Sequence, residues 1–168
     1  MTTNSYPFQF VGTDTSGSDK YMKDVLVYTF VSQKSGHRYQ VNIERYLEHL
    51  CCVKFFDRNT NLAAGRFSQL SGTYEPRTIL RTVAEIALDA LKKDSEASFC
   101  FVGAADGKDD RERTTRRFRV YMQFVKDLGV GEQFWPFALK DYSMCVLVNK
   151  NSVSDRKDYI SKIISFIE

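Results

Sequence analysis

Basic and acidic side chains crowd the stretch from Lys108 to Arg119, which holds six basic and three acidic residues. The apolar residues that follow recur at helical spacing and predict a helix from about Arg113 to Leu128, so several arginines lie at its N-terminus. Cations there oppose the helix dipole unless an anion shares the site. Two guanidinium groups on one helical face suit a phosphate or a carboxylate. We therefore expect an anion-binding site formed by Gly103, Arg113, Arg116 and Arg117.

The same cluster has two other interpretations. It is an ordinary solvated helix start if its acidic residues favour the dipole and pair with arginines one turn on, although exposed pairs contribute only about 0.2–1 kcal/mol each. It is a nucleic-acid surface if Tyr74, Trp135 and Phe137 stack on bases. A net charge of +3 is too small to imply such a partner, and the usual nucleic-acid motifs are absent.

The chain has four cysteines, which are Cys51, Cys52, Cys100 and Cys145. All lie in apolar, strand-like runs, where thiols usually behave as small buried hydrophobic groups. Cys51 and Cys52 are adjacent and would point to opposite faces of a strand, which is awkward for a shared metal. His49 lies beside them, but no C-x-x-C motif and no paired histidines complete a ligand set, so we expect no metal site.

Other catalytic chemistries find little support in the sequence. His37 and His49 are the histidines available for a Ser-His-Asp or Cys-His arrangement, and the chain has no G-x-S-x-G elbow. It also has no Walker A loop and no Rossmann glycine motif. These absences argue against hydrolases and nucleotidases.

Length and composition predict one domain over residues 1–168. A chain of 168 residues with 43% hydrophobic content can bury a substantial core. No early stretch has the pattern of a signal peptide, and no apolar run approaches the roughly 20 residues that span a bilayer. We therefore expect a cytoplasmic protein with no membrane partner.

Residue periodicity predicts the elements that must position these side chains. A period of two predicts strands at Tyr6–Gly12, Asp24–Ser32, Arg38–Tyr46, Leu50–Phe56 and Leu62–Leu70. A period of 3.6 then predicts a helix over Pro76–Lys93. After it we expect a strand at Ala97–Ala104, the helix Arg113–Leu128, strands at Glu132–Leu139 and Tyr142–Lys150, and a last helix capped by Ser154.

This order predicts a mixed α+β domain. Strands dominate residues 1–70, a helix-strand-helix-strand-strand series occupies 71–150, and a C-terminal helix occupies 151–168. From about Leu62 to Lys150 the order resembles the fold of the GCN5-related N-acetyltransferases. In that family, the acetyl-CoA pyrophosphate binds a loop of the form Q/R-x-x-G-x-G/A at a helix N-terminus. "QLSGTY" is similar to that loop, and the resemblance implies cofactor binding by Gln69, Gly72 and Thr73, although Tyr74 stands where the family has glycine or alanine.

The general acid of the acyltransferases is the second point of comparison. Many members carry a tyrosine in a segment like Y-E-K-L-G-F, where it protonates the leaving thiolate. This chain reads "VKDLGV", with Val125 at the tyrosine position, and valine cannot transfer a proton. Tyr121, one turn earlier, is the alternative acid, but it lies on the apolar stripe and its simpler interpretation is a core aromatic.

A closer resemblance, over almost the whole chain, is to a family of uncharacterised proteins from Bacteroidetes and phages. That family has an opening Y-x-F-x-S, a K-V-L-A-T-V-A helix and a strand that ends in G-S-T-x-A-R-T-R-L-Y. This chain has "YPFQFVG", "RTILRTVAEIALDAL" and "FCFVGAADGKDDRERTTRRFRVY" in the same order, with Ala104 and Ala105 in place of the Ser-Thr pair and a longer loop. The resemblance implies a bacterial or phage protein and supports the fold, but it supplies no activity.

From these observations we expect a non-enzymatic binding or interaction protein on an acyltransferase-like fold, with no cofactor and with a protein or an anionic ligand as its partner. The first alternative is a CoA-dependent N-acyltransferase with an atypical pyrophosphate loop, which would use acetyl-CoA. The second is a nucleic-acid-binding accessory protein that uses the arginine cluster.

Overall fold

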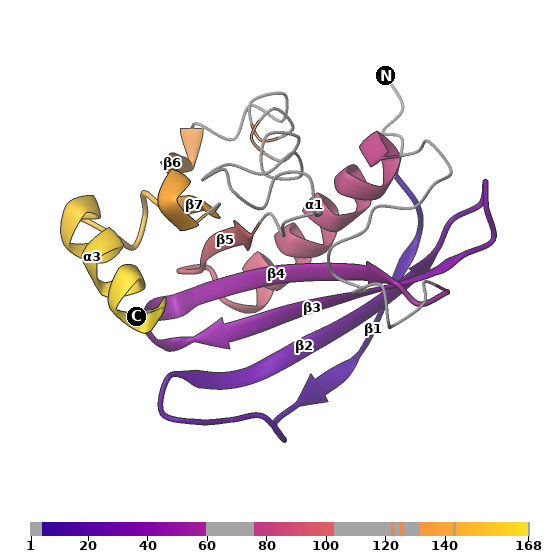
Figure 1. Ribbon diagram of the computed structural model, residues 1–168, viewed down its shortest axis with the longest axis horizontal. Coiled ribbons are helices and arrows are strands. Elements are labelled where there is room, and N and C mark those ends of the chain that lie inside the picture. The colour runs from indigo at the N-terminus through magenta and orange to yellow at the C-terminus, as the bar shows by residue number, and fades with distance from the viewer. Residues whose placement is uncertain are drawn as a thin grey trace.

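A seven-stranded sheet carries the structure, a computed structural model that describes residues 5–59, 76–102, 122, 125, 132–142 and 144–167 (Figure 1). Its strand order is β1-β2-β3-β4-β5-β7-β6, and helices α1 and α3 pack on it. The mixed α+β class predicted from the sequence is confirmed. None of the described helices is long and apolar enough to cross a membrane.

The first four strands form an antiparallel meander, and the period-two pattern predicted a strand in each of these four places. They are β1 (Phe8–Asp14), β2 (Met22–Val31), β3 (Arg38–Tyr46) and β4 (Leu50–Asp57). Gly36 lies in the turn between β2 and β3 with φ of 75°, a backbone conformation that glycine adopts without steric cost. Each strand therefore pairs with its neighbour in sequence.

The pairing changes at β4. Strand β5 (Ser98–Val102) runs parallel to β4, from Leu50 opposite Ser98 to Val53 opposite Phe101. Parallel neighbours need a crossover connection, and the predicted helix α1 (Pro76–Lys93) lies between these strands in the sequence. Strand β7 (Met144–Asn149) is antiparallel to β5, and β6 (Phe134–Leu139) pairs with the far side of β7.

Side chains alternate between the two faces of the sheet and divide the buried residues into two cores. The α1-side core packs the apolar stripe of α1 against the sheet and includes Tyr28, Val41, Ile43, Cys51, Val53, Ile79, Val83, Ile86, Phe99 and Leu147. The α3-side core lies under α3 (Arg156–Ile167) and includes Leu50, Cys52, Cys100, Met144, Val146, Val148, Tyr159 and Ile163. The helix predicted over Pro76–Lys93 is confirmed, and its apolar residues face the sheet.

The cap of α3 differs from the prediction. The backbone N–H of Asp158 donates to the carboxylate Oδ1 of Asp155 at 3.0 Å, so Asp155 caps the helix and the prediction of Ser154 was wrong. Both residue types make good caps, and the helix begins one residue later than Ser154 would require. The buried side of α3 carries Tyr159 and Ile163.

Candidate functional site

The site residues predicted from the sequence lie outside the described residues. They are Gly103, Arg113, Arg116 and Arg117 of the anion site, Gln69, Gly72 and Thr73 of the cofactor loop, and the possible acid Tyr121. They stay predictions, as do the strand Leu62–Leu70 and most of the helix Arg113–Leu128. Val125, at the position of the acyltransferase tyrosine, is described: it is helical and belongs to the α1-side core.

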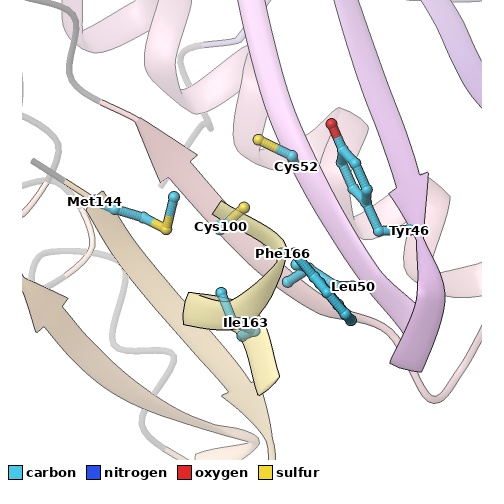
Figure 2. Close-up of a pocket in the computed structure, with 7 residues that line it drawn as sticks. All are labelled: Tyr46, Leu50, Cys52, Cys100, Met144, Ile163 and Phe166. Carbon is cyan, nitrogen blue, oxygen red and sulfur yellow. The ribbon is translucent and has the colours of Figure 1, made fainter. Parts of the chain in front are cut away.

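An apolar pocket of about 190 Å³ lies between α3 and the strands beneath it (Figure 2). Figure 2 shows the two thiols between Tyr46 on one side and Met144 on the other, with Ile163 and Phe166 of α3 beside them. The lining residues are Tyr46, Leu50, Cys52, Cys100, Met144, Ile163 and Phe166.

Three of the lining residues carry sulfur. Cys52 and Cys100 lie directly opposite each other on the parallel strands β4 and β5, and Met144 opens β7 on the same face. A hydrogen bond to Cys52, together with complete burial, raises the pKa of Cys100 well above its ordinary value of 9.0. Since the thiolate is the nucleophilic form of cysteine, Cys100 is an inert, polarisable surface at neutral pH.

Tyr46 brings a hydroxyl group to the otherwise apolar lining of the pocket. The Tyr46 hydroxyl donates to Oε1 of Glu44 at 2.7 Å, and Lys54 Nζ lies 3.2 Å from the same oxygen. Burial, and then the hydrogen bond to Glu44, raise the pKa of Tyr46 far above its ordinary value of 10.0. The hydroxyl therefore stays protonated, and its proton is used in the hydrogen bond to Glu44.

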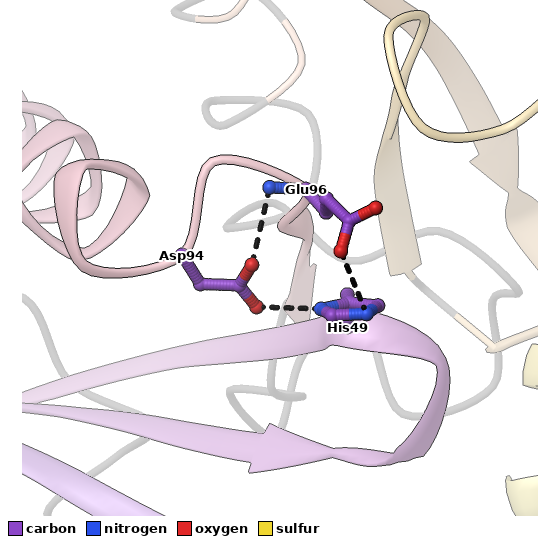
Figure 3. A group of neighbouring side chains, drawn as sticks. All are labelled: His49, Asp94 and Glu96. Carbon is purple, nitrogen blue, oxygen red and sulfur yellow. Dashed lines mark hydrogen bonds and ion pairs between the residues drawn. The ribbon is translucent and has the colours of Figure 1, made fainter.

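A second cluster lies where two turns meet, between β3 and β4 and between α1 and β5 (Figure 3). His49 Nδ1 is 2.8 Å from Oδ2 of Asp94, and His49 Nε2 is 3.2 Å from Oε2 of Glu96. The hydrogen bond with Asp94 raises the pKa of His49, and burial offsets only part of that rise. An imidazolium is the form that can donate to both carboxylates.

The backbone at this cluster is strained. Among the described residues, Glu48 and His49 are the non-glycine residues with positive φ, at 62° and 56°. This conformation costs about 1–2 kcal/mol per residue, and turns that need it usually carry asparagine or glycine. Two residues of α3 stabilise the β3–β4 turn. The Tyr159 hydroxyl donates to the Glu48 carbonyl at 2.8 Å, and Lys162 Nζ lies 3.7 Å from Oε1 of Glu48.

Sequence reasoning missed both the pocket and this cluster. The cysteines were correctly assigned to buried strands, but nothing in the sequence paired Cys52 with Cys100 across β4 and β5. His49 was considered only together with its neighbouring cysteines. The available signal was the acidic segment "DSE" directly after α1, which the parallel crossover returns to the start of β5, beside the β3–β4 turn.

The chain was compared with models of protein families, with curated proteins and with solved structures. No family model, curated protein or solved structure matches the chain.

Proposed function

We propose that the protein binds a compact apolar group and is not an enzyme, on a fold similar to that of the acyltransferases. The observation that carries this proposal is the pocket of about 190 Å³ between α3 and the sheet. The bound group is either a small molecule or a side chain of a protein partner, and the two share the same apolar chemistry.

The size and lining of the pocket indicate what fits. A dry apolar cavity of about 150 Å³ is known to hold a benzene molecule, so this pocket suits a substituted benzene ring or an indole. Phe166 and Tyr46 offer aromatic contacts, and the Met144 thioether is polarisable and packs well against aromatic rings. Because the Tyr46 hydroxyl is already bonded to Glu44, the pocket would recognise a ligand through its apolar group.

The chemistry of the lining favours binding over catalysis. Among the described residues that line the pocket, none carries a carboxylate, an imidazole or an amine. Cys100 is held as a neutral thiol. A ligand bound in this pocket would therefore make apolar contacts and would have no acid, base or nucleophile among the described lining residues.

The test is a titration with indole and with toluene, followed by the methionine methyl resonances in NMR. Saturable shifts of the Met144 methyl group are expected in the natural protein. Cys52→Leu, which fills the pocket, should abolish them. Cys51→Leu is the matched control, because Cys51 is adjacent in β4 but faces the α1-side core, so binding should persist. No saturable shift with either probe, or unchanged binding in Cys52→Leu, would overturn the proposal.

The second candidate is a CoA-dependent N-acyltransferase. The parallel pairing of β4 with β5 favours this candidate. Helix α1 lies between these strands in the sequence, which fits the strand-helix-strand order of that family. Calorimetry and thermal unfolding with acetyl-CoA test it, with Gly72→Asp and Arg113→Ala variants in parallel. Saturable stabilisation lost in Gly72→Asp supports this candidate. If millimolar acetyl-CoA produces no response, the acyltransferase candidate is excluded and the proposal of a binding protein stands.

A further inference from the structure

The cluster of His49, Asp94 and Glu96 is separate from the apolar pocket and offers a different chemistry. Figure 3 shows the imidazole of His49 lying between the two carboxylates, each of which comes from the turn that follows α1. One ligand atom from each residue can be chosen so that all three lie within 4.8 Å of one another. One imidazole nitrogen and two carboxylate oxygens form a donor set that suits zinc and manganese ions.

The distances are close to those of a coordinated ion. Bonds of about 2.0–2.2 Å place the ligand atoms of a divalent ion about 3 to 4 Å apart. His49 Nδ1 and Asp94 Oδ2 lie 2.8 Å apart, which is the length of a hydrogen bond, so these two atoms would separate slightly to admit an ion. Glu96 lies on the Nε2 side of the ring at 3.2 Å, and its side chain is 59% exposed, so it can turn to complete the set.

The Asp94 carboxylate is already oriented for this role. Its Oδ1 accepts a hydrogen bond from the backbone N–H of Glu96 at 3.1 Å, which leaves Oδ2 directed at His49. A ligating carboxylate that is itself hydrogen-bonded is typical of metal sites, because the outer contact fixes the geometry of the ligand. The site therefore needs rearrangement mainly at Glu96.

The local charge and exposure also suit a cation. Asp94 and Glu96 place two carboxylates against one imidazole, and a divalent ion bound to the neutral imidazole would balance their negative charge. The His49 side chain is 50% exposed, so water can fill the remaining coordination positions. Glu48, next to His49, is directed to Lys162 instead.

We propose that His49, Asp94 and Glu96 form a binding site for a divalent transition-metal ion, which joins the β3–β4 turn to the α1–β5 turn. Three protein ligands and exchangeable water complete the coordination. The site is independent of the proposed apolar ligand, so either proposal can fail without the other.

The test is a titration of the chelator-treated protein with Zn²⁺ by calorimetry and with Co²⁺ by visible absorption. The chain has 2 histidines, so imidazole ¹⁵N resonances identify the ligand directly. We expect one ion per chain and a shift confined to the His49 ring. His49→Asn tolerates the positive φ and so should fold, but it should bind Zn²⁺ at least tenfold more weakly.

Two further variants keep the result unambiguous. His37→Asn is the matched control, because the ion pair described for His37 has one carboxylate, Asp57, at 2.7 Å, and this variant should bind Zn²⁺ like the natural protein. Glu96→Ala removes an exposed ligand without threatening the fold and should also weaken binding at least tenfold. Equal binding in His49→Asn, a shift at His37, or a thiolate-to-cobalt charge-transfer band would overturn the proposal.

Discussion

A side-chain hydrogen bond of Tyr28 joins the sheet to α1. The Tyr28 ring is fully buried, and its hydroxyl donates to Oδ2 of Asp89 at 2.7 Å, while Lys93 Nζ lies 3.4 Å from the same oxygen. Burial by itself would raise the pKa of Asp89. The hydrogen bonds from Tyr28 and Lys93 outweigh it and hold the pKa below the ordinary value of 3.8.

Tyr28→Phe should lower the free energy of unfolding at neutral pH by about 1 kcal/mol, because Asp89 loses a donor. A carboxylate whose pKa is depressed in the folded state stabilises the protein above its unfolded pKa, and this contribution is lost as the pH falls through the folded value. The gap between the variant and the natural protein should therefore shrink below pH 3.8. Urea unfolding at neutral and acidic pH measures it, and a gap independent of pH would contradict the assignment to the Asp89 charge.

Two adjacent cysteines in β4 should respond oppositely to enlargement. Cys51 lies in the α1-side core, and burial raises its pKa to about 12, whereas Cys52 lines the pocket. Cys51→Leu should lower the free energy of unfolding by about 1–3 kcal/mol through overpacking. Cys52→Leu should leave it unchanged or raise it by about 0.5–2 kcal/mol, since it fills a cavity. Urea titration of both variants measures this, and equal losses would mean that the pocket is not available space.

Single residues also show where sequence reasoning ends. The opposite orientation of Cys51 and Cys52 followed from the period of a strand and is confirmed. The contact of His49 with Asp94 joins residues 45 apart in sequence, and it forms only because the β3–β4 turn lies beside the α1–β5 turn. Local periodicity contains no information on which turns lie side by side, so this cluster could not be predicted.

At the scale of elements, the start of α3 offers a direct comparison of two capping residues. Asp155→Ala should lower the free energy of unfolding by about 1 kcal/mol, because the N–H of Asp158 loses its acceptor. Ser154→Ala is the control. Ser154 is exposed and does not cap the helix, so this variant should change the free energy of unfolding by less than about 0.5 kcal/mol. Urea unfolding measures both variants, and the reverse order of effects would restore Ser154 as the cap.

Element positions were largely predictable, whereas element partners were not. The alternating pattern placed β2, β3 and β4 within two residues of their observed ends, and the 3.6-residue period placed α1 at Pro76–Lys93. The pairing of β4 with β5, and of β7 with both β5 and β6, depends on contacts across the sheet. Hydrophobic period reports which face of a strand is buried and does not identify its neighbour.

At the scale of the whole molecule, one sheet separates and supports both cores, so they should unfold together. Trp135 is the single tryptophan, and it lies on β6 and packs against the α3-side core. Its fluorescence should follow the same urea transition as far-ultraviolet circular dichroism, which reports both cores. A tryptophan transition at lower urea would contradict this and would make β6, β7 and α3 a separately unfolding unit.

The order β5-β7-β6 has a consequence for how the chain assembles during synthesis. Strand β6 leaves the ribosome before β7, yet the partner described for it is β7. Until β7 has emerged and paired with β5, β6 has no described neighbour in the sheet to join, and Trp135 and Phe137 have only part of the surface that covers them. The nascent chain thus presents an aromatic, strand-forming segment before the strand that pairs with it has been made. Aggregation is therefore favoured in the interval of translation between β6 and β7.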